Sequence, residues 1–464
     1  MGAGGELPLP ALDDASANLQ ASRVAQDDVY TLAGERSEFT MAPTSPLGSP
    51  AVSTSGSFVS CLLCVLFVLL LLMNAIVVYM YFYQPAKPRP RVQTTPSLNV
   101  SEDDPAMEPF IARPLVCSYH CVVEDPSAVV LPPDGLCHFL FFNLPDTRAY
   151  TTWDKGPCGE EVTGAAKAAA QTKFGLAVHA SRANDTDVDL RLESGVFAFA
   201  RQWDANVRQH GVNYLRGTTD KLFRNFKHHL AVLKRFRTLQ EHFKRQTGYL
   251  LKRNYILLGV QAVYDNFAAE RPGIISFIRT LYKEYPLDLL VINTHFWTWE
   301  PRCLVVGPTM LHAKANLSLP TIGSVASLLP DAAVPEKIAV LLSFSAAVVG
   351  FLMPDTWDES LQYASSCLAA HLYPTTSLCH GGVDAPEEEP LSVVKLSRKL
   401  ATDRSLMLAW DSKETIHAKA KHVYDFYRRE RFGWLVDNVE RDDALAKCAA
   451  LNFSFVRYVK AFMP

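Results

Sequence analysis

Carboxyl and imidazole side chains directly follow several apolar runs of this 464-residue chain. If those runs are parallel strands of a barrel, the side chains gather at the end where barrel active sites lie. The candidates are Asp265, His295, Glu300, Asp437 and Glu440. Glu300 or Glu440 as a general acid, with Asp437 as its partner, would form a glycosidase-like pair. Two carboxylates near a barrel mouth are also common in inert folds, so both interpretations stay open.

Two other chemistries are compatible with this region. His179 and His295, with acidic neighbours, could hold a metal ion, but polar residues at strand ends are more often satisfied internally. We therefore predict no metal and no cofactor. The aromatic residues Phe296, Trp297 and Trp299 could stack on a sugar ring. Packing of a loop against the barrel rim explains them equally well.

The elements that would position these residues are short apolar runs that alternate with longer helical patterns. This alternation predicts βα units and a parallel sheet. Runs such as LCHFLFF and YILLGVQAV are almost continuously apolar, as strands buried on both faces should be. The eight expected strands are 114–119, 136–142, 174–180, 211–215, 255–263, 287–296, 337–344 and 432–439. Eight such units predict an α/β barrel.

A long amphipathic helix is expected at 219–247, between the fourth and fifth strands. Leu222, Leu230, Leu233 and Phe236 share its apolar face, and Gly248 follows as a stop. The other face is rich in lysine and arginine as far as Arg245. Such a face could bind a polyanion, but the wet side of an outer barrel helix is the interpretation we favour.

A small inserted segment that contains a strand is expected before the last barrel strand. Residues 406–410 read as an extra strand. Asp411 and Glu414 then have the spacing of a helix start, with Asp411 as the N-cap and Glu414 reaching back to it.

Residues 58–82 hold twenty-five residues without a charge. About 20 helical residues cross the ~30 Å hydrocarbon layer, so this segment is predicted to be a single transmembrane helix. Residues 1–57, rich in Ala, Ser, Pro and Gly, are expected to be a disordered tail. Proline-rich residues 83–112 are expected to form an extended stalk, and 113–464 the folded domain.

Cysteines and glycosylation sequons indicate the orientation of this span. Eight of the ten cysteines and four Asn-x-Ser/Thr sequons lie after it, which favours an oxidising compartment. The sequons begin at Asn99, Asn184, Asn316 and Asn452. Basic residues just after the span favour a cytosolic C-terminal part instead. Because large domains translocate largely regardless of flanking charge, we predict a type II protein with an extracellular or lumenal C-terminal domain.

The order of the segments resembles the chitinase fold of glycoside hydrolase family 18. LMLAWDSKETIHAKAKHVYDFY is similar to the extra strand of that family, which ends in a Tyr-Asp or Trp-Asp pair, and to its following helix with a buried Ala-Lys step. FGWLVDNVERDDALAKC is similar to the eighth strand, an acidic pair and a cysteine, and LDLLVINTHFW resembles the sixth strand. The resemblance covers roughly residue 114 to the end and implies a (β/α)8 barrel.

The activity of that family depends on a fourth-strand signature, Asp-Gly-x-Asp-x-Asp-x-Glu, whose final Glu protonates the leaving oxygen. The corresponding stretch here is HGVNYLRG, in which only Gly211 is retained. His210, Asn213, Leu215 and Gly217 stand where the family has its acids. The resemblance therefore implies a barrel without the proton donor.

Other family positions are changed too. The sixth-strand Met-x-Tyr-Asp pattern reads Asn293-Thr-His295-Phe296, and the eighth-strand tryptophan corresponds to Asp437. The resemblance also implies two disulfide bonds. One joins Cys117 or Cys121 to Cys137, and the other joins Cys367 to Cys448.

These observations predict a membrane-anchored, chitinase-like barrel that is catalytically inactive and binds a carbohydrate or an extracellular protein. Two alternatives remain: an active glycoside hydrolase with a relocated acid, and an adhesion or receptor module that binds a polyanion. The net charge of -3, from 45 basic and 48 acidic residues, gives no reason to expect a nucleic-acid partner.

Overall fold

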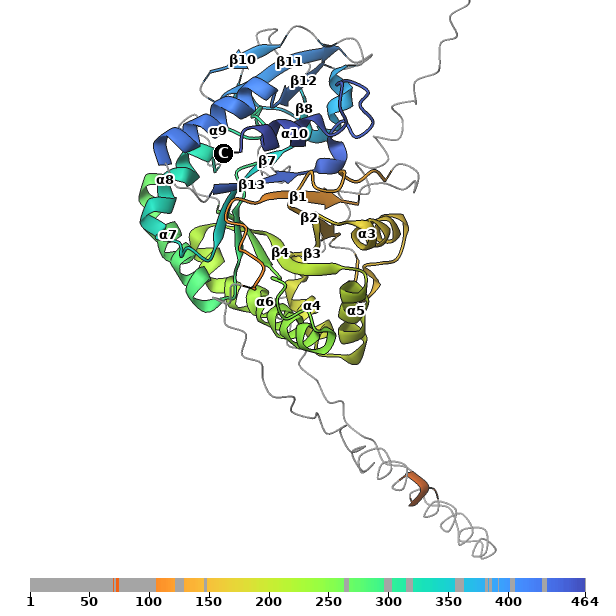
Figure 1. Cartoon of the computed structure of the whole chain (residues 1–464). Coiled ribbons are helices and arrows are strands. Elements are labelled where there is room, and N and C mark those ends of the chain that lie inside the picture. Colours follow the sequence, from red (N-terminus) through yellow and green to blue (C-terminus); the bar gives the residue numbers. More distant parts are fainter. Residues whose placement is uncertain are drawn as a thin grey trace, which may run out of the picture. The chain divides into compact units, whose positions relative to one another are not determined.

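The computed structural model describes most of the chain from residue 106 onward (Figure 1). Within 106–463 the undescribed residues are 122–128, 146–147, 263–266, 296–302, 314–319, 355–362, 380–382, 384–385, 391, 401–404 and 428–431. Upstream, only residues 70 and 72–74 are described, and they are helical. The rest of the predicted span and all of the predicted tail lie outside the described residues. Among the helices that are described, none combines the length and apolarity needed to cross a bilayer.

Eight parallel strands close into a barrel, which confirms the expected architecture. Their order around the barrel is β1-β13-β7-β6-β5-β4-β3-β2. The strands are β1 Leu115–His120, β2 Phe139–Leu144, β3 Lys173–His179, β4 Val207–Gly217, β5 Ile256–Ala262, β6 Leu289–Ile292, β7 Ala339–Ser345 and β13 Phe432–Asp437. Each coincides with one of the eight apolar runs.

Helices surround the barrel, with α7, α8 and α9 along one side and α3 and α5 on another in Figure 1. They are α3 Pro157–Ala168, α4 Ala183–Asp189, α5 Glu193–Asp204, α6 Thr219–Thr247, α7 Phe267–Glu284, α8 Ile322–Ala332, α9 Lys413–Tyr427 and α10 Ser454–Ala461. Helix α6 has the bounds that its periodicity predicts. It ends at Gly248, whose φ of 74° gives the left-handed cap that glycine adopts without strain.

Strand alternation divides the core into two layers. Outward side chains such as Val212 and Leu258 pack under the helices. Inward side chains, among them Phe139 and Leu257, fill the half of the barrel interior where the strands begin. The Tyr255 hydroxyl accepts a hydrogen bond from the Ile111 backbone N–H at 3.1 Å, so the chain before β1 seals the base of the barrel.

An antiparallel sheet of five strands is inserted between β7 and β13, and Figure 1 shows it beside those two strands. Its order is β10-β11-β12-β8-β9. The strands are β8 Val348–Leu352, β9 Ala369–Tyr373, β10 Glu387–Glu389, β11 Val394–Leu400 and β12 Ser405–Trp410. The predicted extra strand at 406–410 is β12. The other four strands were not predicted from the sequence.

Helix α9 begins one residue later than expected. Ser412 is the residue before the helix, and its backbone N–H donates to Thr415 Oγ1 at 2.8 Å. The carboxylate of Asp411 is instead buried against the Lys419 ammonium. The expectation that Asp411 caps the helix is therefore wrong, because its charge is used by a lysine two turns along α9.

Four disulfide bonds join the eight cysteines that follow residue 100, as is typical of an extracellular or lumenal domain. Cys117–Cys137 confirms one implied pair. The implied Cys367–Cys448 pair is wrong. Cys303, in the segment between β6 and α8, pairs with Cys367 of the inserted segment, and the Cys367 backbone N–H donates to the Cys303 carbonyl at 3.0 Å. The remaining bonds are Cys121–Cys158 and Cys379–Cys448.

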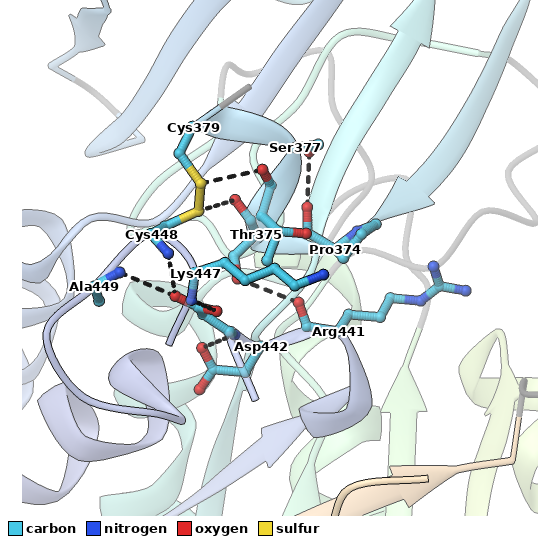
Figure 2. The surroundings of a disulfide bond; sticks show 11 residues. Pro374, Thr375, Ser377, Cys379, Arg441, Asp442, Lys447, Cys448 and Ala449 are labelled. Carbon is cyan, nitrogen blue, oxygen red and sulfur yellow. Dashed lines mark hydrogen bonds between the residues drawn. A yellow bond between two sulfur atoms is a disulfide. The ribbon is translucent and has the colours of Figure 1, made fainter. Parts of the chain in front are cut away.

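Figure 2 shows the surroundings of the Cys379–Cys448 bond. Cys448 lies beside Thr375, and Thr375 belongs to the short turn that leads to Cys379. The carboxylate of Asp443 accepts hydrogen bonds from the backbone N–H groups of Cys448 and Ala449 at 2.7 and 3.0 Å. These bonds fold the loop after β13 on itself, and the Thr375 hydroxyl, which donates to the Arg441 carbonyl at 3.3 Å, joins this loop to the Thr375–Leu378 turn.

Gly211 is needed because β4 and β5 approach closely at that position. A Cβ atom there would lie 2.5 Å from the carbonyl oxygen of Leu257. We expect Gly211→Ala to lower the free energy of unfolding by about 1 to 3 kcal/mol, as overpacking does. Urea denaturation of the full-length chain measures this. Gly164→Ala is the control, because a Cβ there meets nothing within 4 Å, and it should be neutral or slightly stabilising. An equal effect of both substitutions would contradict the explanation.

Candidate functional site

Polar side chains from strands β1, β2, β7 and β13 and from the segment after β6 meet at the mouth formed by the C-terminal ends of the strands. His120 is the last residue of β1 and Asp437 is the last residue of β13. Asn143 lies near the end of β2, Ser343 lies in β7, and His295 follows β6 by three residues. Because all strands are parallel, these ends share one rim, where barrel enzymes place their catalytic groups.

Asp437 is the centre of this group and is fully buried. Its Oδ1 accepts a hydrogen bond from the Tyr214 hydroxyl at 2.7 Å and lies 3.1 Å from His120 Nε2. Its Oδ2 lies 3.1 Å from His295 Nε2 and accepts from Asn438 Nδ2 at 2.9 Å. Two imidazoles, a phenol and an amide therefore surround one carboxylate.

A second layer of contacts holds the two histidines. His295 Nδ1 lies 2.7 Å from Ser343 Oγ, which also accepts from the Thr294 backbone N–H at 2.7 Å. His120 Nε2 lies 2.7 Å from the Tyr214 hydroxyl. Ser343, His295 and Asp437 thus form a chain with the residue types of a hydrolase triad. Ser343 is 0% exposed, however, so its hydroxyl has no access to a substrate.

The charges of this cluster are mutually dependent. Burial alone would lower the pKa of His120, but the charge of Asp437 and its hydrogen bond outweigh burial and raise that pKa. Burial alone would raise the pKa of Asp437, but His120 and His295 hold it well below its usual value. Burial and the charge of Asp437 raise the pKa of Tyr214. Asp437 is consequently an anion whose charge is already compensated within the protein.

Glu440 lies just past Asp437 in the turn Val439–Arg441. Its Oε2 accepts a hydrogen bond from the His120 backbone N–H at 3.0 Å, and its side chain is 3% exposed. Burial raises the pKa of Glu440. The structure therefore brings together the predicted pair Asp437 and Glu440 with His295. The other candidates, Phe296, Trp297, Trp299, Glu300 and Asp265, lie outside the described residues.

A bulge in β4 decides which of its side chains face the barrel interior. The register with β5 shifts between Val212 and Leu215, and Tyr214 has a φ of 63° there. Leu215 therefore packs outward in the core under the helices. Tyr214 reaches inward to Asp437, and strand alternation places Arg216 on the inner face beside Gln261. In the fourth-strand signature, Leu215 and Gly217 correspond to inward-facing positions. Because of the bulge, Tyr214 and Arg216 are the residues that face inward there.

His210 and Asn213, the other two changed motif residues, lie on opposite faces of β4. His210 is fully buried under the helices, stacked on Phe199 with ring centroids 4.4 Å apart, and burial lowers its pKa to about 3. Asn213 faces the barrel interior, where its Nδ2 lies 3.5 Å from Asn143 Oδ1.

The possible metal pair is not brought together as a ligand set. His179 Nδ1 lies 2.7 Å from Ser181 Oγ, and its ring stacks on Tyr214. His295 contacts Asp437 and Ser343. Across the part of the chain that is described, no three His, Cys, Asp or Glu side chains are grouped as metal ligands.

Two of the four sequons can be placed. Asn184 is exposed in α4, whereas Thr186 of the same sequon is buried. Asn452 is half-buried, and its Oδ1 accepts a hydrogen bond from Arg457 Nη2 at 3.0 Å. Asn99 and Asn316 lie outside the described residues.

Sequence reasoning missed three central residues of the mouth: His120, Asn143 and Tyr214. The first two were detectable in principle, because each lies two residues beyond an inward-facing position of its strand, Ser118 and Phe141. The expected strands ended too early, at 119 and 142, so neither residue was considered. Tyr214 had no sequence signal, since only the bulge turns it inward.

The closed barrel with its inserted antiparallel sheet has the fold of the glycoside hydrolase family 18 chitinases and chitinase-like proteins, whose solved structures align with about 76% of the chain. No protein-family model and no curated protein matches the sequence. The family resemblance seen in the sequence is thus confirmed by the fold.

Particular structures show how far the likeness extends. YKL-39, solved in the presence of chitooligosaccharides, aligns at 11% identity and a TM-score of 0.51 over 75% of this chain and 99% of that one. A family 18 chitinase from Cycas revoluta in complex with (GlcNAc)3 aligns at 14% identity and a TM-score of 0.50, over 76% of this chain and 100% of that one. Catalytic domain 2 of the Ostrinia furnacalis group II chitinase aligns at 11% identity and a TM-score of 0.51, over 76% of this chain and 96% of that one.

The match to the multi-modular chitinase ChiW of Paenibacillus sp. str. FPU-7 covers only 33% of that chain, at 10% identity and a TM-score of 0.50. At these identities the likeness establishes the fold alone.

Proposed function

We propose that this protein is a membrane-anchored, chitinase-like barrel that binds a carbohydrate or an extracellular protein without hydrolysing it. The observation that carries the proposal is the composition of β4, Val207–Gly217, which contains no aspartate or glutamate. In family 18 this strand supplies the general acid, and hydrolysis of a glycosidic bond requires a group that can protonate the leaving oxygen.

The mouth supports binding more than catalysis. Asp437 has its charge compensated by His120 and His295, so it is not a carboxylate poised to react. Deeper in the barrel, Asn293 is buried, and neither polar atom of its amide has a hydrogen-bond partner among the described residues. A buried amide left in this state is unfavourable, and a polar guest in the barrel would satisfy it. YKL-39 and the Cycas revoluta enzyme, solved with chitooligosaccharides, make an N-acetylated oligosaccharide the first ligand to test.

A second function, hydrolysis with a relocated acid, is favoured by one observation. The pKa of Glu440 is raised while that of nearby Asp437 is lowered. Such a divergence is what an acid and base pair requires. Against it, both side chains are almost completely buried, and Glu440 accepts a hydrogen bond from the backbone of His120.

The test uses the full-length chain, purified in detergent, with a fluorogenic chito-oligosaccharide. We expect no turnover above the buffer blank, together with measurable binding of unlabelled chitotetraose in calorimetry. Turnover that is lost in Glu440→Gln and kept in Glu160→Gln, which changes an exposed glutamate on α3, would establish the relocated acid instead. Absence of both turnover and glycan binding would leave the protein ligand as the object of a partner screen.

A further inference from the structure

A cavity of about 330 Å3 lies at the end of the barrel where the strands begin, opposite the mouth, and shares no described lining residue with the mouth. It lies where the C-terminal half of α6 meets the chain segments that enter β5, β6 and β7. Its charged lining consists of Arg237, Glu241 and Lys244 on α6, Arg253 before β5, Asp288 before β6 and Lys337 before β7. Four cations and two carboxylates give the lining an excess of two positive charges.

The pairing within the lining leaves this excess on three side chains. The Arg237 guanidinium donates to the carboxylate of Asp288 and to the Asn254 carbonyl, so its donors are used internally. Asp288 also accepts from the Ile256 backbone N–H at 2.7 Å. Lys244, Arg253 and Lys337 then share one further carboxylate, that of Glu241, whose side chain is 41% exposed, and the charge of Arg253 also acts on Asp288.

Lys244 is unusual because its side chain is 90% buried and weakly paired. Within the described residues its charge partner is Glu241, whose Oε1 lies 3.7 Å from the ammonium, which is longer than a hydrogen bond. The stem of Lys244 is buried, whereas its ammonium makes no close ion pair in the described part of the chain and borders the cavity, so it can contact an anion there without first breaking a salt bridge. Arg253 adds a second incompletely used cation, since its Nε has no hydrogen-bond partner among the described residues. Both cations border the same cavity.

We propose that this cavity, which we call the basal cavity, binds a sulfate or phosphate ester carried by a sugar-sized ligand. A tetrahedral oxyanion offers several oxygens to cations that converge from different elements, and charge-assisted hydrogen bonds of this kind are strong. The volume falls at the lower end of the range of small-molecule sites, which suits one or two sugar rings. The site is independent of the proposed function of the mouth, from which it is separated by the packed interior of the barrel.

The experiment is calorimetry on the full-length chain with three probes: a sulfated heparin disaccharide, glucose 6-phosphate and glucuronic acid. We expect the sulfate or the phosphate ester to bind and the carboxylate sugar to bind more weakly. Which ester binds more tightly distinguishes the two sources of the oxyanion. Loss of one charge-assisted hydrogen bond, about 1.5 to 3 kcal/mol, should weaken binding at least about tenfold in Lys244→Gln.

Arg245→Gln is the matched control, because Arg245 is the next residue on α6, carries the same charge and is exposed. It should change the affinity by less than about twofold, as a solvated charge does. Lys244→Arg should restore binding. Equal weakening by Arg245→Gln would mean diffuse adsorption to the basic face of α6 and would overturn the site. Wild-type affinity in Lys244→Gln, or no ester binding at all, would overturn it too. If Lys244→Gln does not fold by circular dichroism, Lys337→Gln at the exposed rim replaces it, with the same two outcomes.

Discussion

Replacing Lys419 with methionine should lower the free energy of unfolding by about 3 to 5 kcal/mol, because it leaves the charge of Asp411 buried without its cation. Both side chains are 0% exposed. The Lys419 ammonium donates to Asp411 Oδ1 and to the Thr309 carbonyl. It thereby joins α9 to the end of β12 and to the segment after β6, so three separate parts of the chain depend on one side chain.

Urea denaturation of the full-length chain measures this loss. Lys421→Met is the control. Lys421 lies two residues after Lys419 on the same helix and pairs with Asp425 in solvent, with side-chain exposures of 62% and 53%. Its loss should cost less than about 1 kcal/mol. The double variant Asp411→Leu, Lys419→Met should recover part of the stability, since two apolar side chains leave no buried charge. A loss below about 1 kcal/mol in Lys419→Met would show that the pair does not join these elements.

The barrel could be predicted because its strands are buried on both faces. A strand covered by helices outside and by side chains inside must be apolar at nearly every position, and that pattern is local. Helix α6 could be predicted equally well, since its apolar residues recur at helical spacing and Gly248 ends it. The inserted sheet was not, because β9 is half-exposed and β10 is only three residues long, so neither has a strong pattern.

The mouth depends on contacts that the sequence does not encode locally. Tyr214 is 223 residues from Asp437, and it reaches that residue only because the bulge in β4 turns it inward. The partner of Cys367 is set in the same way, by the bridge between Leu304 and Ser366 that holds Cys303 beside it. Polar residues at strand ends could be named as candidates, but their pairing could not.

Replacing Asp437 with asparagine should destabilise the protein by about 3 kcal/mol near pH 5.5, because it removes the carboxylate that His120 and His295 share. The pKa of Asp437 is depressed in the fold, so its contribution is present above the unfolded value near 3.9 and is lost as the pH falls through the folded pKa. The pKa of His120 is raised, so its contribution is full below about 6.5 and is lost as the pH rises through the folded pKa. The difference between wild type and variant should therefore be largest between about pH 4 and pH 6.5.

Denaturation curves across this pH range test the shape as well as the size of the effect. An NMR titration of the His120 ring should show its pKa falling in the variant, because burial then acts without the opposing charge. Asp204→Asn, at the exposed end of α5, should change stability by less than about 0.5 kcal/mol at every pH. A loss that does not vary with pH would mean that the carboxylate acts only as a hydrogen-bond acceptor. A variant as stable as wild type would contradict a structural role for Asp437. It would then leave Asp437 available as the partner of Glu440 in the alternative acid–base pair, whose activity the chito-oligosaccharide assay measures directly.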